Sequence, residues 1–174
     1  MANYYFVRHG EARIEEAYTK IYQDWGFNML TLSEKGIEQI KETSKDERLK
    51  EAQIIITSPF GRALHSAAIL SKELGVDLMV ETDLHEWIPD IDYQFLSDED
   101  ALGSFKEFYI NKGIKNANCK YNFETLEHLR NRINNVLKKY QNYDTVIVVC
   151  HGVIMQCLLG MNDLKNGQIG EYEL

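Results

Sequence analysis

The sequence predicts an α/β fold, with a mostly parallel central sheet and helices on its faces. Apolar runs rich in β-branched residues alternate with helical patterns in the first half of the chain, in the order strand, helix, strand, helix, strand. This alternation is typical of a parallel sheet covered by helices. The chain has 174 residues, which suits one domain with a sizeable core, so we expect a single domain over residues 1–174.

Two of the predicted strands end in the same dipeptide. Residues 4–7 are an apolar and aromatic run that leads into Arg8-His9-Gly10, and residues 145–150 lead into His151-Gly152. Ligands of open α/β sheets bind outside the carboxyl ends of the strands. We therefore expect both histidines, with the guanidinium of Arg8 beside them, at one edge of the sheet.

Caps and chain breaks define the remaining elements. Ser33 is a plausible N-cap for a helix, and Gly75 is a plausible end for the helix that follows the strand at 53–57. We expect a short helix and a loop at 14–28, a strand at 76–80, helices at 97–110, 123–140 and 153–159, and an edge strand at 167–174.

Residues 87–122 form an irregular stretch with many aromatic side chains, including Tyr93, Phe95, Phe105 and Phe108. We interpret this stretch as a lid-like insertion over a ligand site, which could exclude water or select an apolar leaving group. The alternative is that it extends the hydrophobic core.

Charge and composition exclude several classes of function. The formal net charge is −8, which argues against nucleic-acid binding, because that needs a basic surface. No apolar run is long enough to cross a bilayer, and no secretory signal precedes the first strand. We therefore expect a cytoplasmic protein with no membrane partner. The three cysteines include no Cys-x-x-Cys pair, as expected for reduced thiols.

Five residues near strand ends carry the chemistry: Arg8, His9, Arg62, Glu86 and His151. Two guanidiniums and an imidazolium can neutralise the oxygens of a phosphoryl group without a metal. A second imidazole can attack phosphorus, and a carboxylic acid can protonate the leaving oxygen and then activate water. The set therefore indicates phosphoryl transfer.

These residues lie in four of five motifs, which follow one another as Arg8-His9-Gly10-Glu11, Leu32-Ser33-Glu34-Lys35-Gly36, Thr57-Ser58-Pro59-Phe60-Gly61-Arg62-Ala63, Leu84-His85-Glu86 and Cys150-His151-Gly152. In content and order they resemble the histidine phosphatase superfamily, the phosphoglycerate-mutase-like proteins, in its phosphatase branch. The resemblance spans nearly the whole chain.

The resemblance implies a three-layer α/β/α sandwich and no metal or other cofactor. It implies that His9 is the phosphorylated nucleophile and that Arg8, Arg62 and His151 form the phosphate pocket, with His151 also taking part in catalysis. Glu86 would be the proton donor. The substrate would be a small phosphorylated metabolite, and a phosphohistidine protein remains an open alternative.

The chain departs from the family pattern at several positions beside the motifs. Ala12 follows the Glu of the first motif, where many relatives have Thr or Ser, and Arg13 comes next. His65 stands where relatives often have Gln. Trp87 begins a segment that replaces a Gly-x-Trp-Glu-Gly pattern. Glu11, Arg13, His65 and Trp87 are therefore candidates for contact with the rest of the substrate, with a structural or surface role as the alternative.

Other functions stay open at this point. A phosphoglycerate-mutase-type phosphotransferase is disfavoured, because such mutases are longer and carry further phosphate-binding segments. A non-catalytic phospholigand-binding module on the same fold would be expected to have lost His9 or Glu86, and both are present. A metallohydrolase is disfavoured by the absence of a His-Glu-x-x-His motif. The sequence leaves the natural substrate and the oligomeric state open.

Overall fold

The central sheet has five strands in the described part of the chain. The computed structural model describes residues 2–16, 24–92 and 97–173. The strands are β1 (Asn3–Arg8), β2 (Ile54–Thr57), β3 (Leu78–Val80), β4 (Thr145–Cys150) and β5 (Ile169–Glu173), in the order β3-β2-β4-β1-β5. β1, β2, β3 and β4 pair in parallel, and β5 pairs antiparallel with β1 at the edge. The predicted mostly parallel sheet and its C-terminal edge strand are confirmed.

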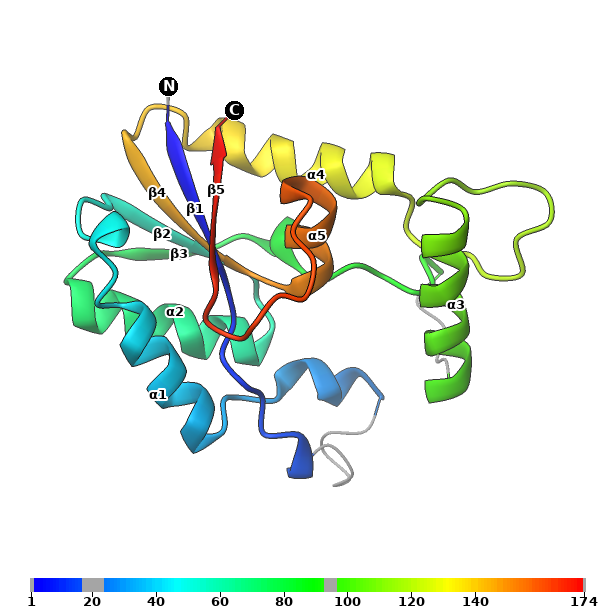
Figure 1. The fold of residues 1–174 in the computed structure, drawn as a ribbon, viewed down its shortest axis with the longest axis horizontal. Helices are drawn as coiled ribbons and strands as arrows, with labels where there is room; N and C mark the ends of the chain where they lie inside the picture. Colours follow the sequence, from blue (N-terminus) through cyan, green and yellow to red (C-terminus); the bar gives the residue numbers. More distant parts are fainter. Residues whose placement is uncertain (1, 17–23, 93–96, 174) are drawn as a thin grey trace.

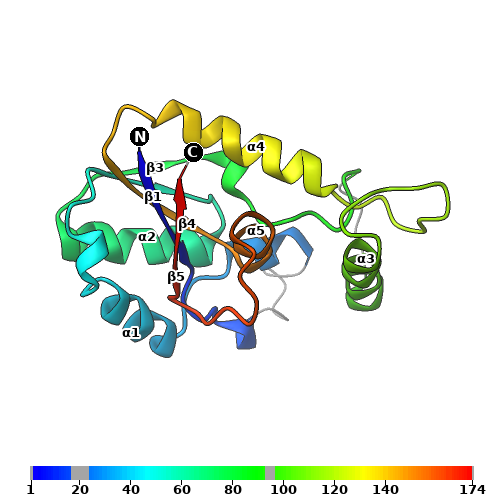
Figure 2. The ribbon, with the colours of Figure 1, turned by 45° about the horizontal axis from the view of Figure 1, so that its top comes forward.

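Helices cover both faces of this sheet, as Figures 1 and 2 show. The α-helices are α1 (Glu34–Thr43), α2 (Gly61–Leu74), α3 (Asp98–Ile110), α4 (Leu126–Lys139) and α5 (Gly152–Leu159). Short 3₁₀ helices lie at η1 (Ile14–Glu16), η3 (Asp24–Met29), η4 (Glu47–Leu49) and η5 (Thr82–Leu84). α1 and α2 lie on one face, and α4 and α5 lie on the other. This is the three-layer α/β/α sandwich that the sequence predicted.

The pleat of each strand builds the two cores. Successive side chains of a strand point to opposite faces. Tyr4 and Phe6 accordingly belong to the buried cluster on the side of α4 and α5, whereas Val7 belongs to the cluster on the side of α1 and α2. β4 is buried at every position, which explains its continuous apolar run.

Two boundaries differ from the sequence expectation for local reasons. β3 begins at Leu78 rather than at 76, because the Val76 N–H still donates to Ser71 O at the end of α2. α4 begins at Leu126 rather than at 123, because Thr125 caps it by accepting the His128 N–H over 3.2 Å. The expected cap at Ser33 is present, Ser97 caps α3 in the same way, and Gly75 ends α2 with φ of 70°.

Within the described residues, the helical structure expected at 14–28 consists of the two 3₁₀ helices η1 and η3. Residues 17–23 of this range lie outside the described part. With three residues η1 has the usual length of a 3₁₀ helix, whereas η3, with six, is longer than most.

The stretch 87–122 contains α3, which is set apart from the sheet near the amino end of α4 (Figures 1 and 2). Its attachment is an aromatic cluster of Trp87, Phe105, Phe108 and Phe123, which is continuous with the core on the side of α4 and α5. The cluster extends the core, as the alternative reading expected. A lid-like role for α3 stays a prediction, and Tyr93 and Phe95 lie outside the described residues.

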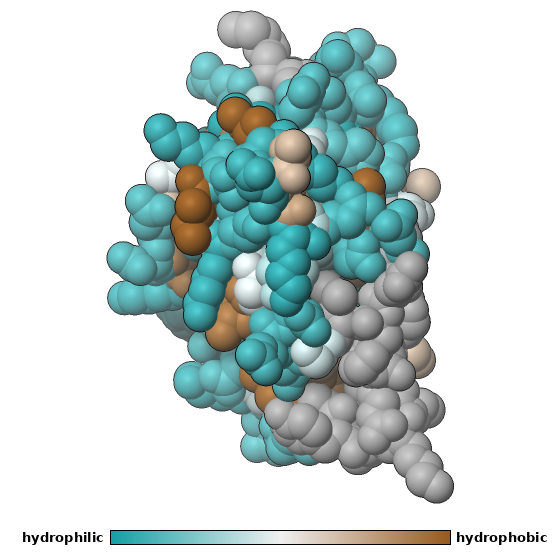
Figure 3. All heavy atoms as spheres, turned by 90° about the vertical axis from the view of Figure 1, so that its right-hand side faces the viewer, coloured by the Kyte–Doolittle hydropathy of each residue, from teal (hydrophilic) through white to brown (hydrophobic). Residues whose placement is uncertain are grey.

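The surface around α3 is mixed in polarity. Figure 3, which views the molecule from the side of α3, shows a mostly hydrophilic face with separate hydrophobic spots. Exposed apolar side chains of α3 and the loop after it are Leu102, Ile110 and Ile114. Among the described helices, none combines the length and the apolar character needed to span a bilayer.

Candidate active site

The pairing of β1 with β4 brings the two His-Gly motifs together. Arg8 is in register with Cys150, and the His9 N–H donates to Cys150 O over 3.1 Å. The rings of His9 and His151 therefore lie side by side, with centroids 5.2 Å apart and planes at 62°. Both residues are buried.

Two hydrogen bonds define the tautomer of His9. Gly10 O can only accept, so the ring Nδ1 at 2.7 Å must donate to it. Arg62 Nε carries a hydrogen and donates to His9 Nε2 over 3.3 Å. Nε2 is therefore the unprotonated nitrogen, which is the form a nucleophile needs.

The surroundings of His9 keep it neutral. Burial, the charge of Arg62 and, to a lesser extent, the charge of Arg8 lower the pKa of His9 to about 3. At neutral pH the ring is uncharged, and the Nε2 lone pair is available.

Backbone contacts explain why glycine stands at position 10 in the first motif and at position 36 in the second. A Cβ on Gly10 would lie 2.5 Å from Gly36 O, and a Cβ on Gly36 would clash with the Glu11 backbone. The Gly10 N–H donates to Ser66 Oγ, which in turn donates to Arg62 O. The loop after β1 is thus packed tightly against α1 and α2.

Three buried nitrogen atoms near His9 have no hydrogen-bond partner. Among the described residues, the buried side-chain nitrogen and oxygen atoms left without a partner are Arg8 Nε, Arg62 Nη1 and His151 Nδ1. Buried polar groups are normally paired. Unpaired donors from two guanidiniums and a ring suit an anion.

Ser58 orients the ring of His151. Ser58 Oγ accepts the Phe60 N–H over 3.2 Å and lies 2.8 Å from His151 Nε2. When the Ser58 hydroxyl donates to Nε2, the ring hydrogen is on Nδ1, the atom that has no partner. Burial, followed by the charge of Arg62, holds the pKa of His151 well below its ordinary value.

Glu86 supplies a carboxyl group beside this centre. Its Oε1 accepts the Trp87 N–H over 2.8 Å, and its Oε2 accepts the Val153 N–H of α5 over 3.2 Å. Burial raises the pKa of Glu86 above its ordinary value, although both N–H groups and the charge of Arg62 oppose this. A carboxyl group that keeps its proton longer can act as a general acid.

Two of the four flanking candidates are engaged elsewhere. The Glu11 carboxylate accepts from Ser33 Oγ and pairs with Lys35 Nζ at 2.7 Å. The Trp87 side chain is buried, and its Nε1 donates to Glu124 O over 2.8 Å. What Trp87 presents to Glu86 is its backbone N–H.

The other two candidates are His65, which lies on α2, and Arg13, whose backbone N–H donates to Thr31 O over 2.9 Å. His65 Nδ1 accepts the Leu32 N–H over 3.3 Å, and burial, then the charge of Arg13, lowers its pKa. His65 also lines an open groove of about 570 Å³ with Asn28, Met29, Thr31, Pro59, Phe60, Gly61, Leu64 and Ala68. The Phe60 ring borders both this groove and the site, with its centroid 5.3 Å from that of His151.

Sequence reasoning missed several residues that support the site. Ser58 and Ser66 lie within the motif around Arg62 or just after it, so their position was a usable signal. Glu124 and Arg132 are far from every motif, and only the fold brings them to Glu86. In the described ranges, no three His, Cys, Asp or Glu side chains are grouped to hold a metal ion.

Comparison with known proteins identifies the family of the chain. The model of the histidine phosphatase superfamily (branch 1) matches residues 4–170. The chain therefore belongs to the histidine phosphatase superfamily. Among curated proteins, no sequence matches significantly.

Solved structures show the same fold at low identity. YhfR of Bacillus stearothermophilus has a TM-score of 0.72 at 20% identity, with 100% of this chain and 92% of that chain covered. A mycobacterial glucosyl-3-phosphoglycerate phosphatase has a TM-score of 0.70 at 16% identity, with 98% of this chain and 90% of that chain covered. A phosphoglycerate mutase of Bacillus anthracis has a TM-score of 0.66 at 19% identity, with 98% of this chain and 86% of that chain covered.

Proposed function

We propose that this protein is a metal-independent phosphatase that hydrolyses a phosphomonoester through a phosphohistidine on His9. The observation that carries the proposal is the unprotonated Nε2 of a neutral His9, set beside three buried nitrogen atoms without partners. A nucleophile and a pocket for the oxygens of a phosphoryl group are thus combined in one place.

In the first step, His9 Nε2 attacks phosphorus and the bond from phosphorus to the ester oxygen breaks. Arg8, Arg62 and His151 bind the oxygens of the transferred group, where negative charge must be stabilised. Glu86 gives its proton to the departing oxygen, so the product leaves as an alcohol.

In the second step, the Glu86 carboxylate takes a proton from water while the water oxygen attacks phosphorus. The bond between phosphorus and Nε2 breaks and inorganic phosphate is released. His9 returns to its neutral form and Glu86 to its acid form, so the cycle is closed.

The substrate class follows from charge and from the flanking surface. The net charge of −8 disfavours a polyanion such as a nucleic acid, so we propose a small phosphorylated metabolite. The mostly apolar groove beside Phe60 and His65 could receive part of its leaving group. Two structural neighbours act on compounds of this kind by their names, one as a glucosyl-3-phosphoglycerate phosphatase and the other as a phosphoglycerate mutase.

The test is hydrolysis of an aryl phosphate in excess EDTA by the wild type and by His9→Ala. We expect turnover by the wild type alone. A His9→Ala variant that is folded and retains more than a few per cent of the rate would exclude His9 as the nucleophile. Interconversion of phosphoglycerate isomers without phosphate release would favour the mutase alternative. Phosphate binding without turnover would favour a binding module.

A further inference from the structure

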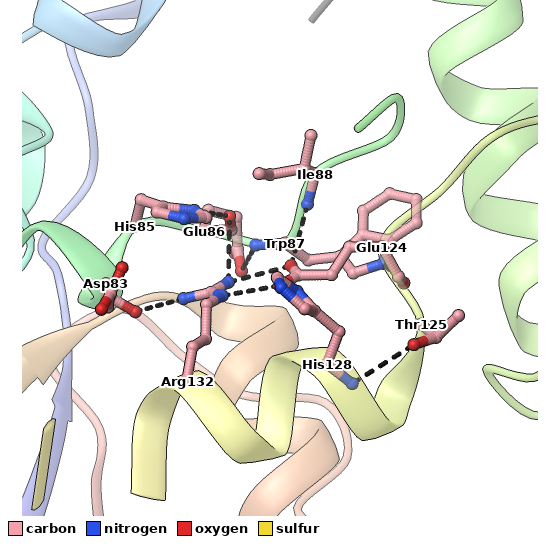
Figure 4. A network of polar contacts seen from close by, with 9 residues as sticks. All are labelled: Asp83, His85, Glu86, Trp87, Ile88, Glu124, Thr125, His128 and Arg132. Atoms are coloured by element: carbon pink, nitrogen blue, oxygen red, sulfur yellow. Dashed lines mark hydrogen bonds and ion pairs between the residues drawn. The ribbon is translucent and has the colours of Figure 1, made fainter. Parts of the chain in front are cut away.

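A buried ion pair lies against the loop that carries Glu86. Arg132 of α4 and Glu124, just before that helix, have side chains that are 6% and 0% exposed. Arg132 Nε is 2.6 Å from Glu124 Oε1, and Arg132 Nη2 is 2.9 Å from Oε2. Figure 4 shows this two-pronged contact beneath the loop that carries Glu86.

The remaining donors of Arg132 are directed at the backbone of that loop. Nη1 donates to Asp83 O, and Nη2 donates to the carbonyl of Glu86 over 3.4 Å. One guanidinium therefore binds both ends of the turn that presents the Glu86 side chain (Figure 4).

Glu124 binds the same loop just after Glu86. Its Oε2 accepts the Ile88 N–H over 3.3 Å, its backbone N–H donates to Ile88 O over 2.9 Å, and its carbonyl accepts from Trp87 Nε1. The backbone of Asp83, Glu86 and Ile88 is thus hydrogen-bonded to Arg132 or Glu124. The Glu86 carboxyl itself accepts the backbone N–H groups of Trp87 and Val153.

Stability alone is a weak explanation for such a pair. The desolvation of two buried charges usually offsets their attraction, so an apolar pair of similar volume often serves as well. What an apolar pair cannot supply is the set of hydrogen bonds to the carbonyls of Asp83 and Glu86. Those bonds determine where the Glu86 backbone lies.

We propose that Glu124 and Arg132 are positioning residues, which fix the loop so that the Glu86 carboxyl stays at the amino end of α5 beside the phosphate pocket. The inference rests on the function proposed above, in which Glu86 is the proton donor. It predicts a defect in leaving-group protonation rather than in phosphate binding.

The experiment compares the hydrolysis of an alkyl and an aryl phosphate by Arg132→Lys and by the double variant Glu124→Met/Arg132→Met. An aryl leaving group needs little protonation, so kcat/KM for the aryl phosphate, which covers the steps up to the phosphohistidine, should change little. The kcat/KM for the alkyl phosphate should fall by roughly 10- to 100-fold, part of the 10²–10⁴ that a positioned acid contributes. Slower hydrolysis of the phosphohistidine, in which Glu86 is the base, lowers kcat without changing kcat/KM, so kcat/KM is the quantity compared.

The matched control is Arg48→Met. It removes another two-pronged arginine–carboxylate contact, to Asp46, at a surface site remote from Glu86. We expect it to leave the ratio of alkyl to aryl rates as in the wild type. Arg132→Lys keeps a cation at the position, so it supplies the measurement even where the double variant does not fold.

The Glu86→Gln background separates this inference from the function on which it rests. If Glu86→Gln lowers kcat/KM selectively for the alkyl phosphate, adding Arg132→Lys should lower it no further. Equal losses of kcat/KM on both substrates from a folded Arg132→Lys would overturn the positioning role while leaving the acid in place. No selectivity from Glu86→Gln itself would remove the basis of both proposals.

Discussion

Arg62 donates its Nε–H to Nε2 of His9 over 3.3 Å, so the residue that binds phosphate also determines which nitrogen of the histidine is free. In the absence of substrate this contact holds the ring in its unprotonated form at Nε2. When a phosphoryl group arrives, the same guanidinium can turn its donors to the phosphoryl oxygens. One side chain thereby prepares the nucleophile and the electrophile.

We expect a covalent phosphohistidine to accumulate in Glu86→Gln with an aryl phosphate as substrate. Formation of the intermediate needs little acid help with this leaving group, whereas its hydrolysis needs a base to activate water. Rapid quenching followed by mass spectrometry of the intact protein should detect the adduct. An adduct that also forms in His9→Ala would place the phosphoryl group on another residue.

We expect Arg62→Lys to lower kcat/KM for an aryl phosphate by about 10²- to 10³-fold, as for the loss of one preorganised donor. Lysine keeps the charge but lacks the planar fork, so it cannot contact His9 and two phosphoryl oxygens together. Arg48→Lys is the control, because Arg48 pairs with Asp46 and Glu171 on the surface. A comparable rate loss in both variants would contradict a specific role for Arg62.

Vanadate should inhibit the enzyme and raise its melting temperature, because it mimics five-coordinate phosphorus. At about 100 times its dissociation constant, such a ligand stabilises the folded state by roughly 2.7 kcal/mol. Arg62→Ala should lose most of this stabilisation. Thermal unfolding with and without vanadate measures it, and an equal shift in the wild type and the variant would place the ion elsewhere.

The contribution of His9 to the stability of the protein should fall as pH decreases from 6.5 toward 4.5. His9, with its pKa lowered to about 3, stays neutral in the folded state in this window, whereas it becomes protonated in the unfolded chain near its ordinary value of 6.5, and the lowered pKa of His151 acts in the same direction. At this position the unfolded state therefore binds more protons, and His9 contributes a slope of up to roughly 1.4 kcal/mol per pH unit. Urea unfolding of the wild type and of His9→Gln at several pH values tests this, and identical slopes would contradict it.

Gly10→Ala should destabilise the fold by about 1–3 kcal/mol, the usual cost of overpacking. The new Cβ would lie 2.5 Å from Gly36 O, a backbone atom that cannot move aside alone. Gly152→Ala is the matched control, because its Cβ would lie at ordinary contact, 3.5 Å from Arg8 Nε. Urea unfolding of both variants measures the difference, and equal stabilities would contradict the close approach of the loop after β1 to α1.

Part of the site was predictable because the chemistry lies at strand ends. Arg8 and His9 follow β1 directly, and His151 follows β4, so a parallel sheet was enough to predict that they meet. Other features were not predictable. Trp87 was a candidate for substrate contact because it begins a segment that departs from the family pattern, yet its side chain lies in the aromatic cluster with Phe108 and Phe123.

The sequence by itself determined the layers of the fold, the strands that lead into the motifs and the residues that gather around His9. Apolar periodicity and position at a strand end are local properties of the chain. Only the tertiary structure decided which nitrogen of His9 is free and what holds Glu86 in place. Glu124 and Arg132 reach the acid across 38 and 46 residues of sequence, through hydrogen bonds to backbone atoms that every residue type shares. A contact of that kind leaves no pattern in the sequence, because its partner is the course of the chain rather than the identity of a side chain.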